Sequence, residues 1–334
     1  MEAGSRMFPF RIQPRFRFTF QRLSTPCNAA CKSIRPARRK GLLQSGMDKT
    51  AAPLPALFVS HGSPMLALEP GTTGPFLERL GRAVDAAFGR PRAIVAVSPH
   101  TSARTPVVHG SAGHHAVHDF GGFPEALYRL QYNPPGAPEL TRRVQNLLAA
   151  SGLEATTSDD PGLDHGIWSV LRFAWPEADV PVLPIALAPR QPPSAQWALG
   201  AALAPLLQEG VLVLGSGSAT HNLGLIFGAA RPATDAVEID ESRAFRDWVA
   251  GRAAAGDHDA LLDYRTRAPH AALMHPSDEH WLPFYIAAGA GGLHAPGVRL
   301  HDAVTYGCLG MDAYAFGESA ARLEEALGAA EGRR

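Results

Sequence analysis

Cysteine is scarce in this chain, and lysine and long hydrophobic runs are scarce as well. The 334 residues include three cysteines, too few for a disulfide framework, which favours a reducing compartment. No unbroken run of about 18 apolar residues occurs, so we expect no membrane-spanning helix. Basic and acidic residues balance at 31 each, and a hydrophobic fraction of 46% is ordinary for a globular protein.

The zero net charge hides an uneven distribution along the chain. Residues 1–48 hold ten basic and two acidic residues, which leaves 21 basic and 29 acidic residues for the remainder. An acidic body is a poor candidate for nucleic-acid binding, which requires a basic surface. We interpret residues 1–50 as a basic disordered tail, an organellar transit segment at 1–48, or a mis-assigned start ahead of Met47. The transit segment is the less favoured reading, and we expect a cytoplasmic protein.

Residues 51–330 form one expected folded domain, in which short apolar runs alternate with segments of helical periodicity. The expected strands are continuously apolar, as strands buried on both faces of a parallel sheet are: Ala56–Ser60, Ala93–Ser98, Val180–Leu187 and Val211–Leu214. The expected helices are Phe76–Phe88, Glu139–Ala150, Ser194–Leu207, Glu238–Arg252 and His280–Ala290. This order predicts an α/β fold: a single domain with a mostly parallel central sheet flanked by helices. The Gly-, Pro- and His-rich residues 105–138 are expected to be a long loop of the functional kind.

Histidines follow three of the expected strands. His61 ends the stretch FVSH, His100 ends AVSPH, and His221 ends GSGSATH. Because ligands of open α/β sheets bind outside the carboxyl ends of the strands, these side chains should meet at one edge. His280 begins an expected helix. A lone histidine at a strand end is usually a turn residue, but several converging imidazoles without thiolates suit iron, zinc or copper. The pattern predicts a metal site at the carboxyl ends of the strands.

Two further histidines lie beside aromatic and glycine residues. His118 begins HDFGGFP and His165 lies in LDHGIW, where an imidazole could act as a general acid or base. The alternatives are a turn for the first and a helix start capped by Asp164 for the second. His114 and His115 are expected to lie in a solvated loop, and the other histidines have no comparable context. Four aromatic residues are candidates for either a pocket wall or plain core: Phe120, Phe123, Trp168 and Trp281.

Taken together, these stretches resemble the class III extradiol ring-cleavage dioxygenases, and most closely the 4,5-DOPA dioxygenase family of bacteria and plants. The matching stretches appear in the family's order over residues 54–315: PALFVSHGSPM, AIVAVSPH, HDFGGFPEALY, LDHGIWSVL, GSGSATHNL and SDEHWLPFYIAAGA. Any one of them is weak evidence, but six in order are specific. The resemblance implies an α/β catalytic domain that inserts O2 into a catechol-type ring, DOPA-like or related, to give a ring-opened semialdehyde.

The resemblance also implies roles for individual residues. His61, His100 and His280 resemble metal ligands, and His221 is similar to a histidine described as a fourth ligand or as an acid/base residue. His165 matches a candidate acid/base residue, and His118 matches a residue that faces the substrate. Fe(II) is the metal expected for activity, and Zn(II) is often found in the same site. The expected partners are a small catechol substrate and O2, with no nucleic acid and no membrane; the oligomeric state stays open.

Some alternatives remain at this point. The wider class often uses two histidines and a carboxylate, and Glu279 adjoins His280. Since neighbouring residues on a helix face different directions, we expect only one of them to bind, and we favour His280. Arg104 and Arg129 are candidate partners for a substrate carboxylate. A zinc-dependent hydrolase and a non-catalytic metal-binding protein on the same fold are the rival functions.

Overall fold

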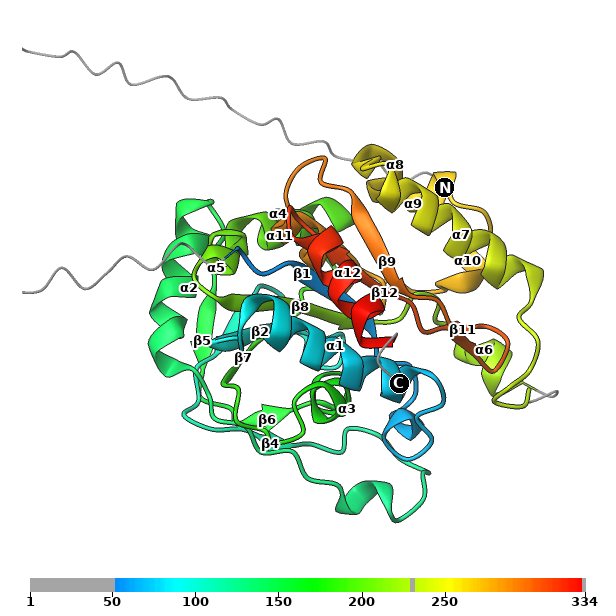
Figure 1. The fold of residues 1–334 in the computed structure, drawn as a ribbon, viewed down its shortest axis with the longest axis horizontal. Coiled ribbons are helices and arrows are strands. Elements are labelled where there is room, and N and C mark those ends of the chain that lie inside the picture. The colour runs from blue at the N-terminus through cyan, green and yellow to red at the C-terminus, as the bar shows by residue number, and fades with distance from the viewer. Residues whose placement is uncertain (1–51, 229–231, 332–334) are drawn as a thin grey trace, which may run out of the picture. The chain divides into compact units, whose positions relative to one another are not determined.

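Four fully buried strands form the centre of the fold, which a computed structural model describes for residues 52–228 and 232–331 (Figure 1). The predicted tail at residues 1–50 therefore lies outside the described residues. The division into this tail and a catalytic domain at 51–330 stays a prediction. The central strands are β1 (Ala56–Ser60), β2 (Ala93–Val97), β7 (Val182–Ala186) and β8 (Val211–Gly217). Every residue in them is buried, as their unbroken apolar sequences predict for strands covered on both faces.

The eight-stranded sheet has the order β5-β3-β7-β2-β8-β1-β12-β9. The four central strands are mutually parallel. Antiparallel pairing occurs between β3 and β7, between β1 and β12, and between β12 and β9. A mostly parallel sheet is therefore confirmed, with antiparallel strands toward both edges. The outer strands are β3 (Val107–His109), β5 (Thr156–Ser158), β9 (Gly297–His301) and β12 (Ala313–Phe316).

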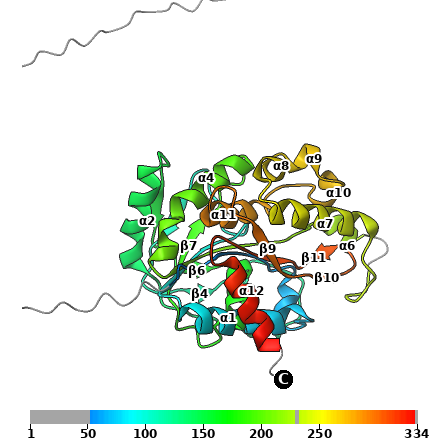
Figure 2. The ribbon, with the colours of Figure 1, turned by 45° about the horizontal axis from the view of Figure 1, so that its top comes forward.

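Helices cover both faces of this sheet (Figures 1 and 2). On one face α1 packs against α3 and α12, and on the other α11 packs against α4 and against β1 and β8. The helices are α1 (Thr73–Phe88), α2 (Pro138–Ala150), α3 (His165–Ala174), α4 (Pro193–Leu203), α5 (Pro205–Gln208), α6 (Leu223–Ile226), α7 (Asp240–Ala254), α8 (His258–Leu262), α9 (Tyr264–Arg267), α10 (Ala271–Met274), α11 (Leu282–Gly291) and α12 (Ala320–Glu331). Short elements complete the fold: 3-10 helices η1 (Pro64–Ala67) and η2 (Leu127–Arg129), and two-residue strands β4 (His115–Ala116), β6 (Gly162–Leu163), β10 (Val304–Thr305) and β11 (Leu309–Gly310).

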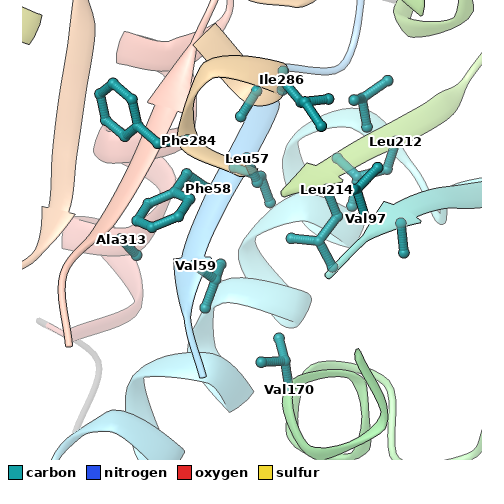
Figure 3. Close-up of a cluster of buried hydrophobic side chains, with 14 of the residues drawn as sticks. Leu57, Phe58, Val59, Val97, Val170, Leu212, Leu214, Phe284, Ile286 and Ala313 are labelled. Atoms are coloured by element: carbon teal, nitrogen blue, oxygen red, sulfur yellow. The ribbon is translucent and has the colours of Figure 1, made fainter. Parts of the chain in front are cut away.

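The core lies between the sheet and these helices. Phe58 of β1 meets Phe284 of α11 edge to face, with ring centroids 5.5 Å apart, and Val170 of α3 lies toward the other face (Figure 3). Trp281 also packs on Phe58, with a centroid distance of 5.7 Å. Side chains of one strand thus pack into the hydrophobic core on both faces of the sheet, because successive residues of a strand point in opposite directions.

The structure changes several predicted boundaries. The expected helix Ser194–Leu207 is broken into α4 and α5 at Ala204, because Pro205 has no N–H to continue the helix. The expected helix His280–Ala290 begins only at Leu282. Residues 105–138 are not loop alone but contain β3, β4 and η2, and β9, β12 and α12 were not predicted.

Glycine sets the distance between α4 and α11. A Cβ on Gly200 would lie 2.1 Å from the Ile286 carbonyl oxygen, and one on Gly289 would lie 2.2 Å from the Trp197 carbonyl oxygen. These distances are shorter than any van der Waals contact, so the two helices can approach closely only because both residues lack a side chain. The close approach keeps α11, and with it the residues just before α11, against the sheet.

Gly200→Ala should lower the free energy of unfolding by about 1–3 kcal/mol, because the added methyl group forces α4 away from α11. Gly251→Ala is the matched control, since it also lies within a helix but a Cβ there meets nothing within 4 Å. That variant should gain about 0.5–1 kcal/mol from reduced backbone entropy in the unfolded chain. Urea unfolding measures both, and equal stabilities of the two variants would contradict the packing argument.

Candidate metal centre

Three histidines follow the carboxyl ends of adjacent strands. His61 comes directly after β1, His100 three residues after β2, and His221 four residues after β8. Since β8 lies between β1 and β2, the three histidines emerge at the same edge of the sheet. The strand order that produces this meeting is not visible in the sequence.

His280 reaches this edge from the segment before α11. Its carbonyl oxygen accepts a hydrogen bond from the Ser218 N–H at 2.9 Å. A Cβ on Gly217 would lie 2.2 Å from the same oxygen, so glycine is needed for this approach. The end of β8 therefore holds the backbone of His280, and this contact places its ring beside those of the strand-end histidines.

Five imidazole rings form one cluster here. The ring centroid of His61 is 5.1 Å from that of His100 and 5.5 Å from those of His165 and His280. His221 stacks on His280 with a centroid distance of 3.5 Å. The Nε2 atoms of His61 and His100 are only 3.1 Å apart. Two groups of three residues each bring together one possible metal-ligand atom per residue, with the three atoms within 4.8 Å of one another. One group is His61, His100 and His165, and the other is His221, Glu279 and His280.

One ring nitrogen of His61 is held from outside the cluster. The Ser216 hydroxyl donates to the Gly166 carbonyl oxygen at 2.5 Å, so it must accept from Nδ1–H of His61 at 3.0 Å. This assigns the proton to Nδ1 and leaves the Nε2 lone pair facing the cluster. Hydrogen bonding of the second nitrogen is how proteins orient histidines that bind metals.

Asp119 was not singled out from the sequence, although it follows His118 in the HDFGG stretch. Its carboxylate accepts hydrogen bonds from the ring Nδ1 and the backbone N–H of His165, both at 3.0 Å. It also lies 3.5 Å from Nδ1 of His100. Burial acts to raise the pKa of Asp119, but the hydrogen bonds from His165 outweigh it and lower the pKa overall. Asp119 is therefore an anion that holds the ring of His165 and lies beside the ring of His100.

Four imidazoles of the cluster, those of His61, His100, His221 and His280, are held in the neutral form. Burial, followed by the neighbouring imidazoles, lowers the pKa of His100 to about 2 and that of His221 to about 3. The pKa values of His61 and His280 are also lowered, again chiefly by burial. Only the neutral imidazole has a lone pair available for a metal ion. The donor set therefore fits a metal that prefers nitrogen ligands.

Glu279 lies closer to the cluster than the sequence argument assumed. We expected Glu279 and His280 to be neighbours on a helix, whereas both precede α11. The Glu279 carboxylate accepts from Nδ1 of His280 at 3.2 Å and from the Ser277 hydroxyl at 3.0 Å. The hydrogen bond with His280 lowers the pKa of Glu279 to about 2. Glu279 thus holds the outer nitrogen of His280, and the choice of His280 as the ligand stays a prediction.

Other predicted histidines do not join the cluster. His118 packs against Trp168, with ring centroids 5.8 Å apart, and its Nε2 contacts the Leu130 carbonyl oxygen at 3.2 Å. The prediction that His114 is solvated is wrong: its ring is buried, with Nε2 3.1 Å from the Val182 carbonyl oxygen. His275, given no role from the sequence, is fully buried beside the cluster with Nε2 2.9 Å from the Ala219 carbonyl oxygen.

A cavity of about 700 Å³ opens over the cluster. His100, His165, His221 and His280 reach its surface, and Asp119 lies beside them. Phe120 and Phe123 line the cavity, as do Leu223 and Phe227. Trp168 and Trp281 are instead fully buried in the core. His118, Arg104 and Arg129 are absent from the described lining.

Comparisons with known proteins decide the family. Residues 55–317 match the model of the catalytic LigB subunit of aromatic ring-opening dioxygenase. The chain belongs to this family. It is an extradiol ring-opening dioxygenase, and its fold and histidine cluster agree with that assignment.

Relatives of this dioxygenase include proteins named 4,5-DOPA dioxygenase extradiol. The one from Beta vulgaris is 36% identical over 78% of this chain and 95% of its own length. The one from Escherichia coli K12 is 33% identical over 77% of this chain and 93% of its own length. The crystal structure of an uncharacterized Escherichia coli K12 protein superposes with a TM-score of 0.64 at 27% identity, covering 79% of this chain and all of the other. In the part of the dioxygenase that the structure describes, no helix is long and apolar enough to cross a membrane.

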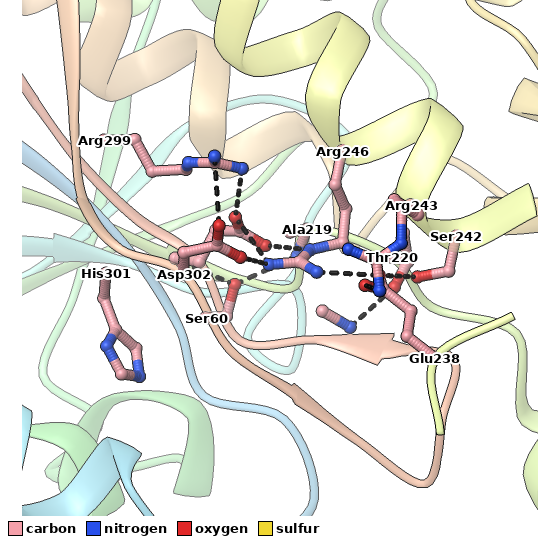
Figure 4. A network of polar contacts seen from close by, with 12 residues as sticks. Ser60, Ala219, Thr220, Glu238, Ser242, Arg243, Arg246, Arg299, His301 and Asp302 are labelled. Atoms are coloured by element: carbon pink, nitrogen blue, oxygen red, sulfur yellow. Dashed lines mark hydrogen bonds and ion pairs between the residues drawn. The ribbon is translucent and has the colours of Figure 1, made fainter. Parts of the chain in front are cut away.

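A buried ion pair supports the dioxygenase's cluster from outside (Figure 4). Arg246 of α7 donates to both carboxylate oxygens of Asp312, at 2.6 and 3.0 Å. The Asp312 carbonyl oxygen accepts from the Ser60 N–H at 3.1 Å and from its hydroxyl at 2.8 Å. That hydroxyl in turn accepts from the Ala219 N–H at 3.0 Å. The chain of contacts thus joins Arg246 to the residue before His61 and to the loop that leads to His221.

Arg246→Ala should lower the free energy of unfolding by about 3–5 kcal/mol, because the fully buried Asp312 would lose its bidentate partner and keep only the more distant Arg299, at 3.5 Å. Arg243→Ala is the matched control. Arg243 also contacts Glu238, at 3.4 Å, but its side chain is 59% exposed, so its loss should cost less than about 1 kcal/mol. Urea unfolding compares the two variants, and similar losses in both would contradict the supporting role of Arg246.

The metal-free dioxygenase should lose stability as pH falls below about 6.5, the ordinary pKa of histidine. Because the pKa values of His61, His100 and His221 are lowered in the folded state, the unfolded chain binds more protons than the folded chain below this pH. Each such histidine removes up to about 1.4 kcal/mol per pH unit until the folded pKa is reached. Urea midpoints at pH 7.5 and pH 5 measure the loss. Equal midpoints would contradict it, and the loss should be smaller in His100→Gln.

Proposed function

We propose that this dioxygenase binds one metal ion through the imidazoles of His61, His100, His221 and His280. The observation that carries the proposal is the convergence of neutral ring nitrogens beneath an open cavity. Outer partners support it, because Ser216 and Glu279 hold the Nδ1 atoms of His61 and His280. Imidazole donors without thiolates suit iron and zinc. Fe(II) is the ion proposed for activity, and Zn(II) can occupy the same ligands.

The proposed substrate is a catechol, DOPA-like or a related aromatic diol, which is opened beside its two hydroxyl groups to give a semialdehyde. The names of the relatives from Beta vulgaris and Escherichia coli support a diol of this kind. The cavity supports it physically, since Phe120 and Phe123 offer apolar surface to a ring held next to the imidazoles. Fe(II), when bound, supplies electron transfer between the diol and O2 and favours ionisation of a coordinated hydroxyl group.

His165 is proposed to handle the proton of the second hydroxyl group. It lines the cavity, and Asp119 holds its Nδ1 in place. The opposite nitrogen is then free to accept a proton from the substrate and return it to the product. His221 also reaches the cavity and is the alternative carrier of this proton if it is not a ligand. The predicted contact of His118 with the substrate requires a substrate that extends beyond the described lining of the cavity, which does not include His118.

Oxygen uptake tests the proposed reaction. Iron-loaded protein should consume O2 in step with DOPA or another catechol and form a yellow ring-opened product. Anaerobic incubation should leave the catechol intact, whereas a hydrolase would be indifferent to oxygen. His61→Ala should lose both the bound iron and the uptake, and the exposed His115→Ala should keep both. Full iron content in His61→Ala would refute its role as a ligand.

His165→Ala should retain its metal and lose turnover by about 10²–10⁴-fold, the usual contribution of a general acid or base. Asp119→Asn should lose less, because the ring of His165 remains but is oriented less well. Iron content and kcat are measured on the same preparations, with His115→Ala as the control. An unchanged kcat in His165→Ala would assign the proton to His221, and loss of iron would make His165 a ligand.

A further inference from the structure

Asp164 is a buried acidic residue directly before His165. It occupies the N-cap position of α3, but its side chain makes no capping hydrogen bond. The carboxylate of Asp119 instead accepts a hydrogen bond from the backbone N–H of His165 at 3.0 Å. The helix-start cap expected from the Asp164 side chain is therefore absent, and its carboxyl group has a different partner.

That partner is Thr101, the residue after His100. The Thr101 hydroxyl donates to Oδ2 of Asp164 at 2.6 Å, whereas Oδ1 has no hydrogen-bond partner among the residues that the structure describes. Burial raises the pKa of Asp164, and the hydroxyls of Thr101 and Ser98 act in the opposite direction. One short hydrogen bond thus ties the residue before His165 to the residue after His100.

The Thr101 end of this contact is anchored to the sheet. The Thr101 carbonyl oxygen accepts from the Leu187 N–H at 2.9 Å, just beyond the end of β7. The Leu187 carbonyl oxygen in turn accepts from the Ala103 N–H at 2.8 Å. The segment that carries His100 is therefore held by backbone contacts of its own, and the contact with Asp164 extends this anchor to the start of α3.

The start of α3 lies close against the same segment. A Cβ on Gly166 would lie 2.4 Å from Oγ of Ser98 and 3.1 Å from Oδ1 of Asp164. The two rings that the contact links, those of His100 and His165, have centroids 3.9 Å apart. A shift of the first turn of α3 therefore moves the ring of His165 relative to that of His100.

We propose that Asp164 is a positioning residue that acts through the Thr101 hydroxyl to hold the ring of His165 in place beside His100. The proposal rests on the proposed function, which gives His165 the proton of the second hydroxyl group. Proton transfer requires hydrogen-bond reach, so a small displacement of the ring lowers the rate. Asp164 serves as a hydrogen-bond acceptor and does not touch the substrate, because it is absent from the described lining of the cavity.

Three substitutions separate the hydrogen bond from the shape of the side chains. Thr101→Val removes the hydroxyl and keeps the branched shape, whereas Thr101→Ser keeps the hydroxyl. Asp164→Asn keeps an acceptor oxygen for Thr101 and removes the ionisable group. Thr141→Val is the matched control, because the Thr141 hydroxyl has no hydrogen-bond partner among the described residues.

Thr101→Val should lower kcat about tenfold with unchanged KM and iron content, because the proton carrier is displaced while metal and substrate still bind. Thr101→Ser and Asp164→Asn should retain kcat within about threefold of the parent, and Thr141→Val should match it. Thr101→Ala, which also lacks the hydroxyl, serves as the test if Thr101→Val does not fold.

Several outcomes would overturn the proposal. Parental kcat in Thr101→Val would show that the hydrogen bond has no effect, and an equal loss in Thr101→Ser would show that shape matters instead. Loss of iron in Thr101→Val would place the effect on His100. A tenfold loss in Asp164→Asn would show that the charge of Asp164 acts, as in a carboxylate base, and not its hydrogen bond.

Histidine-ring NMR on zinc-loaded protein measures the placement of His165 without turnover. The ring signals of His165, assigned by their absence in His165→Ala, should shift in Thr101→Val and stay in place in Thr101→Ser and Thr141→Val. Signals that do not move in Thr101→Val would refute the positioning role. If the parent protein consumes no O2 with any catechol, the proposed reaction is wrong, but the ring signals still decide what holds His165.

Discussion

Burying several imidazoles beside one another is the constraint on which the rest of this structure depends. A buried imidazole is stable only when it is neutral and hydrogen-bonded, because burial penalises both charge and unpaired polar atoms. The pKa of His100, lowered to about 2, expresses the first condition. Ser216, Glu279 and Asp119 meet the second for the outward-facing nitrogens of His61, His280 and His165. The inward-facing nitrogens share the space at the centre of the cluster, where a metal ion would satisfy them together.

Besides these contacts to the rings, the surrounding fold holds the backbone on either side of the cluster. The end of β8 receives the backbone of His280 at Gly217 and Ser218. Ser60 links the end of β1 to Asp312, whose carboxylate is buried against Arg246. Strands and a buried ion pair therefore set the positions of the clustered histidines, while loops form the wall of the cavity. This division allows the cavity to change without disturbing the cluster.

Much of the central sheet could be predicted because its strands are unbroken apolar runs, and β1, β2, β7 and β8 all lie where such runs occur. The outer strand β9, GVRLH, is only partly buried and alternates too weakly to be recognised. The site histidines were found because each follows a recognisable strand or motif. Asp119, His275 and Arg246 were missed because their partners lie 46, 56 and 66 residues away, a separation that no local pattern reveals.

The sequence by itself determined the class of fold, the family and the residue types available for chemistry, because periodicity, apolar runs and local motifs are properties of neighbouring residues. Tertiary structure alone decided which histidines share one centre, since that depends on β8 lying between β1 and β2. It also placed Trp168 in the core, fully buried, rather than in the wall of the cavity. Burial, orientation and the pKa values that follow from them arise only when distant segments pack together.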